Sequence, residues 1–294
     1  MRLAAALAFV LALAGGLAAA GSWRGASVFG LPVFALCAGA ALAIQWLVFL
    51  PSFLARTEHF YDLTGSSTYV LLTVVAYLAG PGGPARLLLA AMVLLWALRL
   101  GAFLFRRVRQ DGGDGRFDRI KHNGPRFFFT WTLQGLWVLV TAGAAWAALG
   151  SAAPGDLGPL GLLGAALWLA GFALEAAADA QKRAFRRRAG AGAFIDEGLW
   201  RYSRHPNYAG EILLWLGVAV AAAPLLSGWQ LVTLVSPLFV YLLLTRVSGV
   251  PLLERRGRER WGDDPAYRRY LERTPVLFPW SRRGPLSGSA DRGP

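Results

Sequence analysis

A short stretch near residue 200 places polar and charged side chains directly in front of a strongly apolar run. From Gly198 to Glu211 the chain reads GLWRYSRHPNYAGE, and the apolar run continues through Trp215. A bilayer does not solvate such groups, so polar residues that enter an apolar span usually mark a site. Pro206 suits the first turn of a helix, where its missing N–H is not needed. On that helix Asn207, Glu211 and Trp215 are four residues apart, so they share one face.

A simpler interpretation makes this stretch the interfacial end of a membrane helix. Arg201, Arg204 and His205 would then lie among lipid headgroups, and Trp215 would be an aromatic anchor. This interpretation explains the arginines and the tryptophan. It does not explain why an amide and a carboxylate follow one and two turns into the apolar segment.

Two further groups of polar residues lie at the ends of apolar segments. Asp62, preceded by Tyr61, stands at the boundary of the segment 60–80, where it could simply cap the helix. Glu175 and Asp179 share a helical face at the end of the segment 157–178.

Arginines follow this second pair of acids. Arg183 and Arg186 could be topogenic charges, which would explain the arginines but not the two acids before them.

Several kinds of site are missing from the sequence. Cys37 is the only cysteine, and the three histidines are too far apart in sequence to suggest a metal site. The chain has no GxGxxG motif after a strand and no P-loop, so any dinucleotide must be bound without a Rossmann fold.

The composition is typical of an integral membrane protein. Of 294 residues, 55% are hydrophobic and 16% are charged. Eight segments are long enough to cross a bilayer, which predicts an all-α polytopic bundle. They are 3–20, 30–54, 60–80, 85–105, 127–149, 157–178, 207–224 and 228–248. A cleaved signal peptide at the first segment is an alternative that would leave seven.

The basic residues are concentrated in alternate connections. Seven Lys or Arg lie in 106–126, seven in 179–206, and ten arginines follow residue 249. With eight spans these regions share one side, which the positive-inside rule assigns to the cytoplasm of a bacterial-type plasma membrane. The net charge of +13 therefore reflects juxtamembrane loops, and we do not expect nucleic acid binding.

We expect a single membrane domain over 1–280, with a core at 127–280, followed by a disordered tail at 281–294. Within this domain Asp264 and Pro265 predict the start of a short amphipathic helix.

The stretch from Gly198 to Glu211 resembles the signature of uncharacterised membrane proteins related to steroid 5-alpha-reductases. The wider superfamily includes sterol C14-reductases and isoprenylcysteine-type methyltransferases. The methyltransferases carry a similar Arg-His-Pro-x-Tyr run, whereas Asn207 followed by Gly210 and Glu211 favours the reductases. The similarity extends over residues 55–280.

The resemblance implies roles for individual residues. It makes Asp62, with Tyr61, the group that polarises or protonates the substrate, although Trp96 stands where the steroid enzymes have a tyrosine. It also makes residues 249–280 a lid over a cytoplasmic cavity. The implied cofactor-binding set comprises Arg116, Glu175, Asp179, Arg183, Arg186, Tyr202, Arg204, His205, Asn207, Tyr208, Glu211 and Trp215.

These implications lead us to expect an NADPH-dependent reductase of a conjugated C=C bond. Its partners would be membrane lipids and a lipophilic small molecule such as a steroid, a polyprenyl compound or another lipid enone, and it would act as a monomer. A methyltransferase that uses S-adenosylmethionine is the alternative, and a non-enzymatic lipid-binding protein is a second one.

Overall fold

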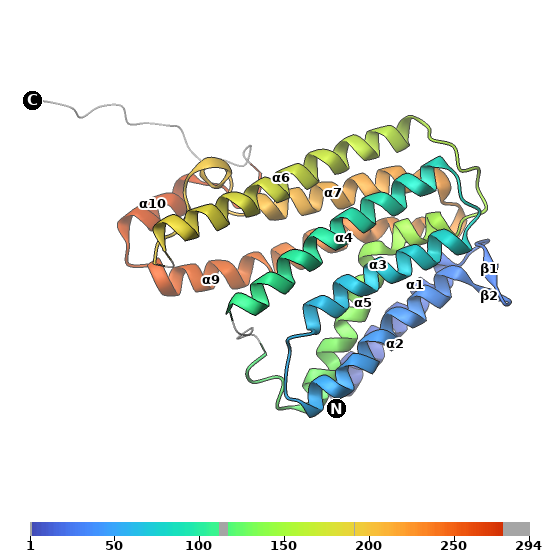
Figure 1. The fold of residues 1–294 in the computed structure, drawn as a ribbon, viewed down its shortest axis with the longest axis horizontal. Coiled ribbons are helices and arrows are strands. Elements are labelled where there is room, and N and C mark those ends of the chain that lie inside the picture. The colour runs from blue at the N-terminus through green and yellow to red at the C-terminus, as the bar shows by residue number, and fades with distance from the viewer. Residues whose placement is uncertain (1, 112–116, 191, 279–294) are drawn as a thin grey trace, which may run out of the picture. The chain divides into compact units, whose positions relative to one another are not determined.

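The computed structural model describes residues 2–111, 117–190 and 192–278, and these residues are almost entirely helical (Figure 1). Contacts divide the chain into two compact units. Unit 1 comprises Met1–Trp168 and Trp215–Phe239, and unit 2 comprises Leu169–Leu214 and Val240–Pro294. Helices α6 and α7 each contribute residues to both units.

The helices occur where the apolar segments predict them. They are α1 (Arg2–Gly21), α2 (Val33–Leu54), α3 (Tyr61–Ala79), α4 (Pro84–Asp111), α5 (Gly124–Leu149), α6 (Pro159–Ala189), η1 (Gly198–Arg201), α7 (Pro206–Ala222), η2 (Ala223–Leu225), η3 (Gly228–Val235), α8 (Ser236–Leu242), η4 (Leu243–Val247), α9 (Val250–Trp261) and α10 (Pro265–Arg273). One hairpin, of β1 (Ser27–Val28) and β2 (Leu31–Pro32), joins α1 to α2.

All eight predicted segments are helical. Among the described residues, seven helices are long and apolar enough to cross a membrane, and α3 is the one of the eight that does not qualify. The first half of α3 carries several hydroxyl and acidic side chains, which lower its mean hydropathy. The all-α polytopic fold is therefore confirmed, and the chain is an integral membrane protein.

Unit 1 is organised around α5, which is buried along most of its length and contacts α1, α2, α3 and α4. Hydrogen bonds between polar side chains link neighbouring helices. The Gln45 amide donates to Thr68 Oγ1 at 3.0 Å, and the Trp146 indole donates to Thr73 Oγ1 at 3.0 Å. Such bonds satisfy polar groups that lipid would leave unpaired.

In unit 2 the helices α6 and α7 approach closely at glycines. A Cβ atom on Gly210 would lie 2.6 Å from the backbone nitrogen of Glu175, and one on Gly171 would lie 2.5 Å from that of Leu214. Small residues of this kind allow two helix backbones to pack together in a membrane. The contact places the acidic end of α6 beside the first turns of α7.

The segment after α10 is bonded to the polar signature, also within unit 2. The backbone N–H groups of Arg204 and His205 donate to the carbonyls of Pro275 and Val276 at 2.9 and 3.1 Å. The helix itself begins as predicted, because Asp264 accepts a capping bond from the N–H of Ala266 at 2.7 Å.

Candidate functional site

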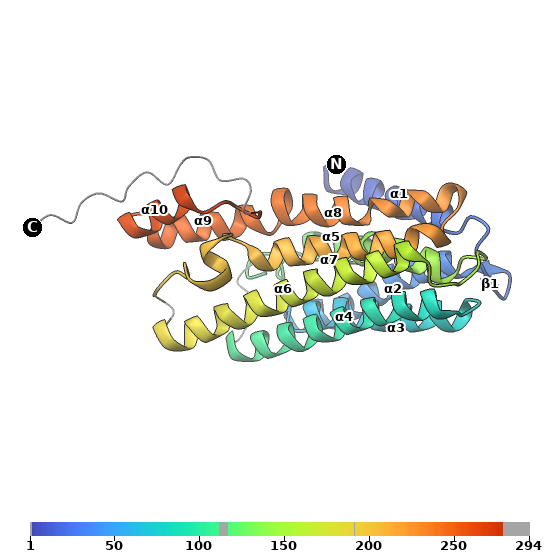
Figure 2. The same cartoon turned by 90° about the horizontal axis from the view of Figure 1, so that it is seen from above.

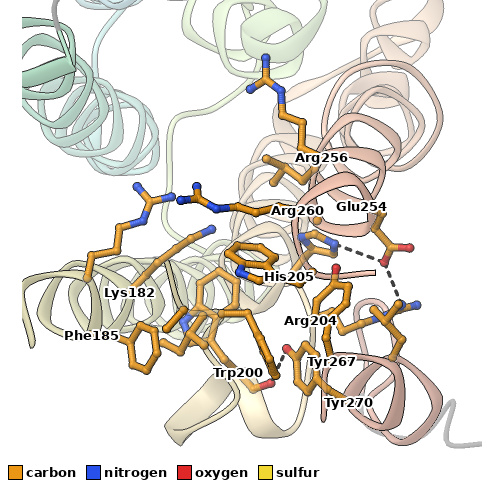
Figure 3. A pocket seen from close by; sticks show the side chains of 18 residues that line it. Lys182, Phe185, Trp200, Arg204, His205, Glu254, Arg256, Arg260, Tyr267 and Tyr270 are labelled. Atoms are coloured by element: carbon orange, nitrogen blue, oxygen red, sulfur yellow. Dashed lines mark hydrogen bonds and ion pairs between the residues drawn. The ribbon is translucent and has the colours of Figure 1, made fainter. Parts of the chain in front are cut away.

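A cavity of about 340 Å³ lies within unit 2 (Figure 3). Its walls come from the end of α6, the loop before η1, the residues just before α7, and the helices α9 and α10. Its size is at the lower end of the range for small-molecule pockets. The lining residues are Lys182, Phe185, Arg186, Ala193, Phe194, Ile195, Trp200, Arg204, His205, Leu253, Glu254, Arg256, Gly257, Arg260, Trp261, Tyr267, Tyr270 and Leu271.

The lining is strongly cationic. It contains five Lys or Arg side chains and one carboxylate, that of Glu254. This carboxylate is already engaged, because Glu254 Oε1 lies 3.1 Å from Arg204 Nη1 and Glu254 Oε2 lies 3.4 Å from Arg258 Nη2. The cavity therefore has an excess of four positive charges, and such a lining favours an anionic ligand.

Four of the cations have no ion pair with a carboxylate in the described part of the chain: Lys182, Arg186, Arg256 and Arg260. They form two pairs, one on α6 and one on α9, and the members of each pair are four residues apart on one helical face. Figure 3 shows Lys182 and Arg260 extending from the two helices toward the same part of the cavity. Arginine pairs with phosphate through two parallel N–H bonds, so this arrangement suits a phosphate group.

Aromatic side chains form the second main part of the lining, and the Arg260 guanidinium lies 5.3 Å from the centre of the Trp261 ring. The Phe194 ring lies 5.1 Å from that of Tyr267, 5.7 Å from that of Tyr270 and 6.1 Å from that of Trp261. Two of these rings are held by hydrogen bonds, from the Trp261 indole to the Gly192 carbonyl at 2.6 Å and from the Tyr270 hydroxyl to the Trp200 carbonyl at 2.8 Å. Burial raises the pKa of both tyrosines, so their hydroxyls stay protonated. A rigid aromatic surface of this kind can stack against a planar ring.

Trp200 connects three elements of the site. Its indole donates to the Ala178 carbonyl at 3.1 Å, and the Lys182 ammonium lies 4.5 Å above the centre of its ring. This cation–π contact keeps the amine at the cavity wall without a carboxylate partner.

His205 is also part of the cavity lining and is buried. Its Nε2 lies 3.6 Å from Glu254 Oε1, and its ring stacks on Tyr208 at 5.5 Å with an interplanar angle of 13°. Burial lowers the pKa of His205, although the neighbouring Glu254 opposes this shift. The imidazole is therefore neutral at pH 7 and can act as a donor or an acceptor toward a ligand.

The structure brings three residues of the implied cofactor set to the cavity: Arg186, Arg204 and His205. Glu175 and Asp179 are buried on α6 in the same unit, and the Oδ1 atom of Asn207 is buried with no hydrogen-bond partner in the described part of the chain. None of these three lines the cavity.

The remaining members of the set lie elsewhere. Tyr208 packs on His205, Glu211 lies on α7, and Arg183 and Tyr202 are exposed outside the lining. The ring of Trp215 belongs to unit 1, where it contacts the rings of Trp96 and Tyr69 at 4.8 and 6.3 Å. Arg116 and the predicted tail at 281–294 lie outside the described residues.

The two residues with an expected catalytic role are in unit 1. The Tyr61 hydroxyl donates to the Thr130 carbonyl at 3.1 Å, and its ring packs against Phe117 and Trp131. Asp62 lies in the first turn of α3, whereas the N-cap position is Phe60, which makes no side-chain cap.

A groove of about 370 Å³ adjoins this turn. Its lining residues are Ile44, Val48, Phe60, Leu63, Thr64, Ser67, Thr68 and Leu71. They come mainly from α2 and α3 and are largely apolar.

Most of the cavity was not recognised from the sequence. Lys182, Glu254, Arg256, Arg260 and the aromatic residues of the lining are not among the site residues that the sequence predicts. One signal was present, since the cations at 182 and 186 and those at 256 and 260 repeat the same four-residue spacing.

The fold and the site together define an integral membrane protein with a polycationic cavity that has an aromatic wall. Residues 48–274 match the family described as "Protein of unknown function (DUF1295)", and the chain belongs to this family. Comparison with curated proteins and with solved structures found no match.

Proposed function

We propose that this protein is a membrane-embedded, NADPH-dependent reductase of a conjugated C=C bond in a lipophilic substrate. The observation that carries the proposal is the cavity of unit 2, where five cations and one paired carboxylate share the lining with aromatic rings. A nucleotide that carries several phosphates fits both kinds of side chain, because its phosphates would meet the cations and its base the rings.

The positive charges of the cavity lining complement the negative charges of NADPH. The 2′-phosphate of this cofactor alone contributes about −1.5 to −2 charges at pH 7, and the pyrophosphate adds more. Lys182, Arg186, Arg256 and Arg260 are the residues that would hold these groups, since they have no carboxylate ion pair in the described chain. Arg204 and His205 would complete the lining from the start of α7.

The same lining disfavours the methyltransferase alternative. S-adenosylmethionine has no phosphate, and its sulfonium and ammonium groups are themselves cationic. A cavity with four excess positive charges would repel them. The Arg-His-Pro-x-Tyr run that both enzyme classes share does not separate them, so the charge of the cavity is the property that supports the reductase.

When bound, NADPH would supply the hydride that reduces the conjugated system at its β carbon. Asp62, in the first turn of α3, would donate a proton to the substrate as the general acid. Tyr61 can assist only if its hydroxyl leaves the Thr130 carbonyl. The apolar groove between α2 and α3 gives a lipophilic chain a place beside this turn. We further propose that the basic connections face the cytoplasm, where NADPH is available.

Calorimetric titration of the detergent-purified protein with NADPH tests the cofactor assignment. We expect the double variant Arg256→Gln, Arg260→Gln to bind at least about 10-fold more weakly, as the loss of charge-assisted hydrogen bonds predicts. Arg255→Gln is the matched control, because Arg255 is exposed on the same helix, pairs with Glu259 and does not line the cavity.

Two outcomes would contradict the proposal. Equal NADPH affinity in the double variant and the control would remove the cavity from cofactor binding. Binding of S-adenosylmethionine in preference to NADPH would favour the methyltransferase. If NADPH binds, its oxidation in the presence of a panel of conjugated enones tests the reaction itself.

A further inference from the structure

The hairpin between α1 and α2 presents an aromatic side chain that the protein does not cover. Phe29 lies at its tip, between β1 and β2, and is fully exposed, and Leu31 beside it is more than half exposed. An isolated exposed leucine is ordinary, but a phenylalanine with no protein contact at a protruding tip needs an explanation.

The hairpin is held firmly at its base. The N–H of Ala26 donates to the carbonyl of Gly150 at 2.6 Å, and the N–H of Val33 donates to the carbonyl of Ala26 at 2.9 Å. Gly25 also forms a bridge with Ser151. The tip is therefore presented in a fixed direction from the end of α5, beyond the ends of α1 and α2 (Figure 2).

The backbone at the tip adopts an unfavourable conformation for an aromatic residue. Phe29 has a φ of 51°, in the left-handed region that favours glycine, and Gly30 follows with a φ of 79°. A bulky residue rarely occupies this region, and strain of this kind is found mostly where a function maintains it. The pairing of Val28 with Leu31 maintains this turn, but among the described residues no side-chain contact favours a phenylalanine at position 29.

The position of the hairpin identifies what lies around it. It connects two helices that are apolar and long enough to cross a bilayer, so it must sit at a membrane surface. Arg24 is the only charged residue in 22–32. Trp23 is 42% exposed and contacts Gly228, and Trp229, which follows that glycine, is 62% exposed. Tryptophans at the level of the headgroups are typical of membrane interfaces.

We propose that the hairpin of residues 22–32 is a lipid-docking element. It inserts the Phe29 ring into the boundary between headgroups and acyl chains of the protein's own bilayer, with Trp23 and Trp229 at the same level. This role does not depend on the proposed enzymatic activity. The partner is a lipid surface, because an uncharged aromatic tip next to membrane helices matches the chemistry of the interface and offers no polar groups for a specific protein contact.

Nitroxide accessibility in lipid nanodiscs with one copy per disc tests the proposal. The label is placed at Phe29→Cys in a Cys37→Ala background, since Cys37 is the only cysteine. Asp156→Cys is the control, because Asp156 is an exposed charged residue in the connection after α5, near the base of the hairpin. We expect the label at 29 to be accessible to oxygen, which concentrates in the bilayer, and poorly accessible to a water-soluble nickel chelate. The label at 156 should be more accessible to the nickel chelate than to oxygen.

Two results would overturn the inference. A label at 29 that is as accessible to the nickel chelate as the label at 156 would place the tip in water. A label that is shielded from both reagents in single-copy discs would show that protein covers it. Since Phe29 has no contacts to lose, its replacement should not impair folding, and unchanged thermal melting of both labelled variants verifies this.

Discussion

Arg86 provides the sharpest test of how unit 1 is held together. It lies in the first turn of α4, is 2% exposed, and has no carboxylate ion pair among the described residues. Its guanidinium donates instead to three backbone carbonyls, those of Gly82 and Ser151 at 2.7 Å and that of Ala153 at 2.6 Å. One side chain thus ties the connection before α4 to the connection after α5. We predict that Arg86→Met destabilises the protein markedly.

The expected size follows from these bonds. A hydrogen bond to a charged group contributes about 1.5–3 kcal/mol, so three of them give an upper limit of about 4.5–9 kcal/mol. Replacing Arg86 by methionine also removes a buried charge. The desolvation of this charge costs several kcal/mol in the folded protein, so its removal offsets part of the lost hydrogen bonding. In addition, freed carbonyls near the surface can bond to water. A net loss of about 2–4 kcal/mol remains. Arg86→Lys retains the charge but not the planar, forked guanidinium group, so its loss of folding stability should be intermediate.

The protein contains its own reporter for this measurement. Cys37 is the only cysteine and is 1% exposed, also in unit 1. Its thiol should react with a fluorogenic maleimide only when the unit opens on heating. We expect apparent melting temperatures in the order wild type, Arg86→Lys, Arg86→Met, from highest to lowest.

Arg126→Met is the matched control, because Arg126 is an exposed arginine of the same unit and its side chain makes no described bond. A melting temperature for Arg86→Met equal to that of the control would refute the reasoning. It would mean that the three carbonyls find equivalent partners without the guanidinium.

Three further predictions concern single positions. Asp62→Asn should retain NADPH affinity but lose about 10²–10⁴-fold in enone reduction, and full turnover on any acceptor that the wild type reduces would exclude proton donation. Burial lowers the pKa of His205 in the folded protein below its unfolded value of about 6.5. The neutral form therefore contributes stability above about pH 6.5, and this contribution is lost as the pH falls toward the pKa of the folded state. Melting of His205→Gln should therefore depend less on pH over this range than melting of the wild type, and equal slopes would disprove the assignment. Gly210→Ala should lower the melting temperature, because its Cβ would lie 2.6 Å from the backbone of Glu175, whereas Gly39→Ala, with open space around it, should not.

The sequence alone determined the secondary structure and the membrane class. Long apolar segments can satisfy their backbone groups in lipid only as helices, so their positions followed from composition and length. Local chemistry likewise predicted the start of α7 at Pro206 and the cap of α10 at Asp264, because both depend on residues within one turn. The placement of Arg204 and His205 just before α7 followed from the same signature.

Only the tertiary structure decided which of these residues meet. Asn207, Glu211 and Trp215 share a helical face, yet Trp215 packs against Trp96 in unit 1, because α7 passes from one unit to the other. Arg256 and Arg260 are more than 70 residues from Lys182 in sequence but line the same cavity. Spacing along a helix fixes which side chains share a face of that helix. Which other element packs against that face depends on interactions between distant parts of the chain, and these are not encoded in any local pattern.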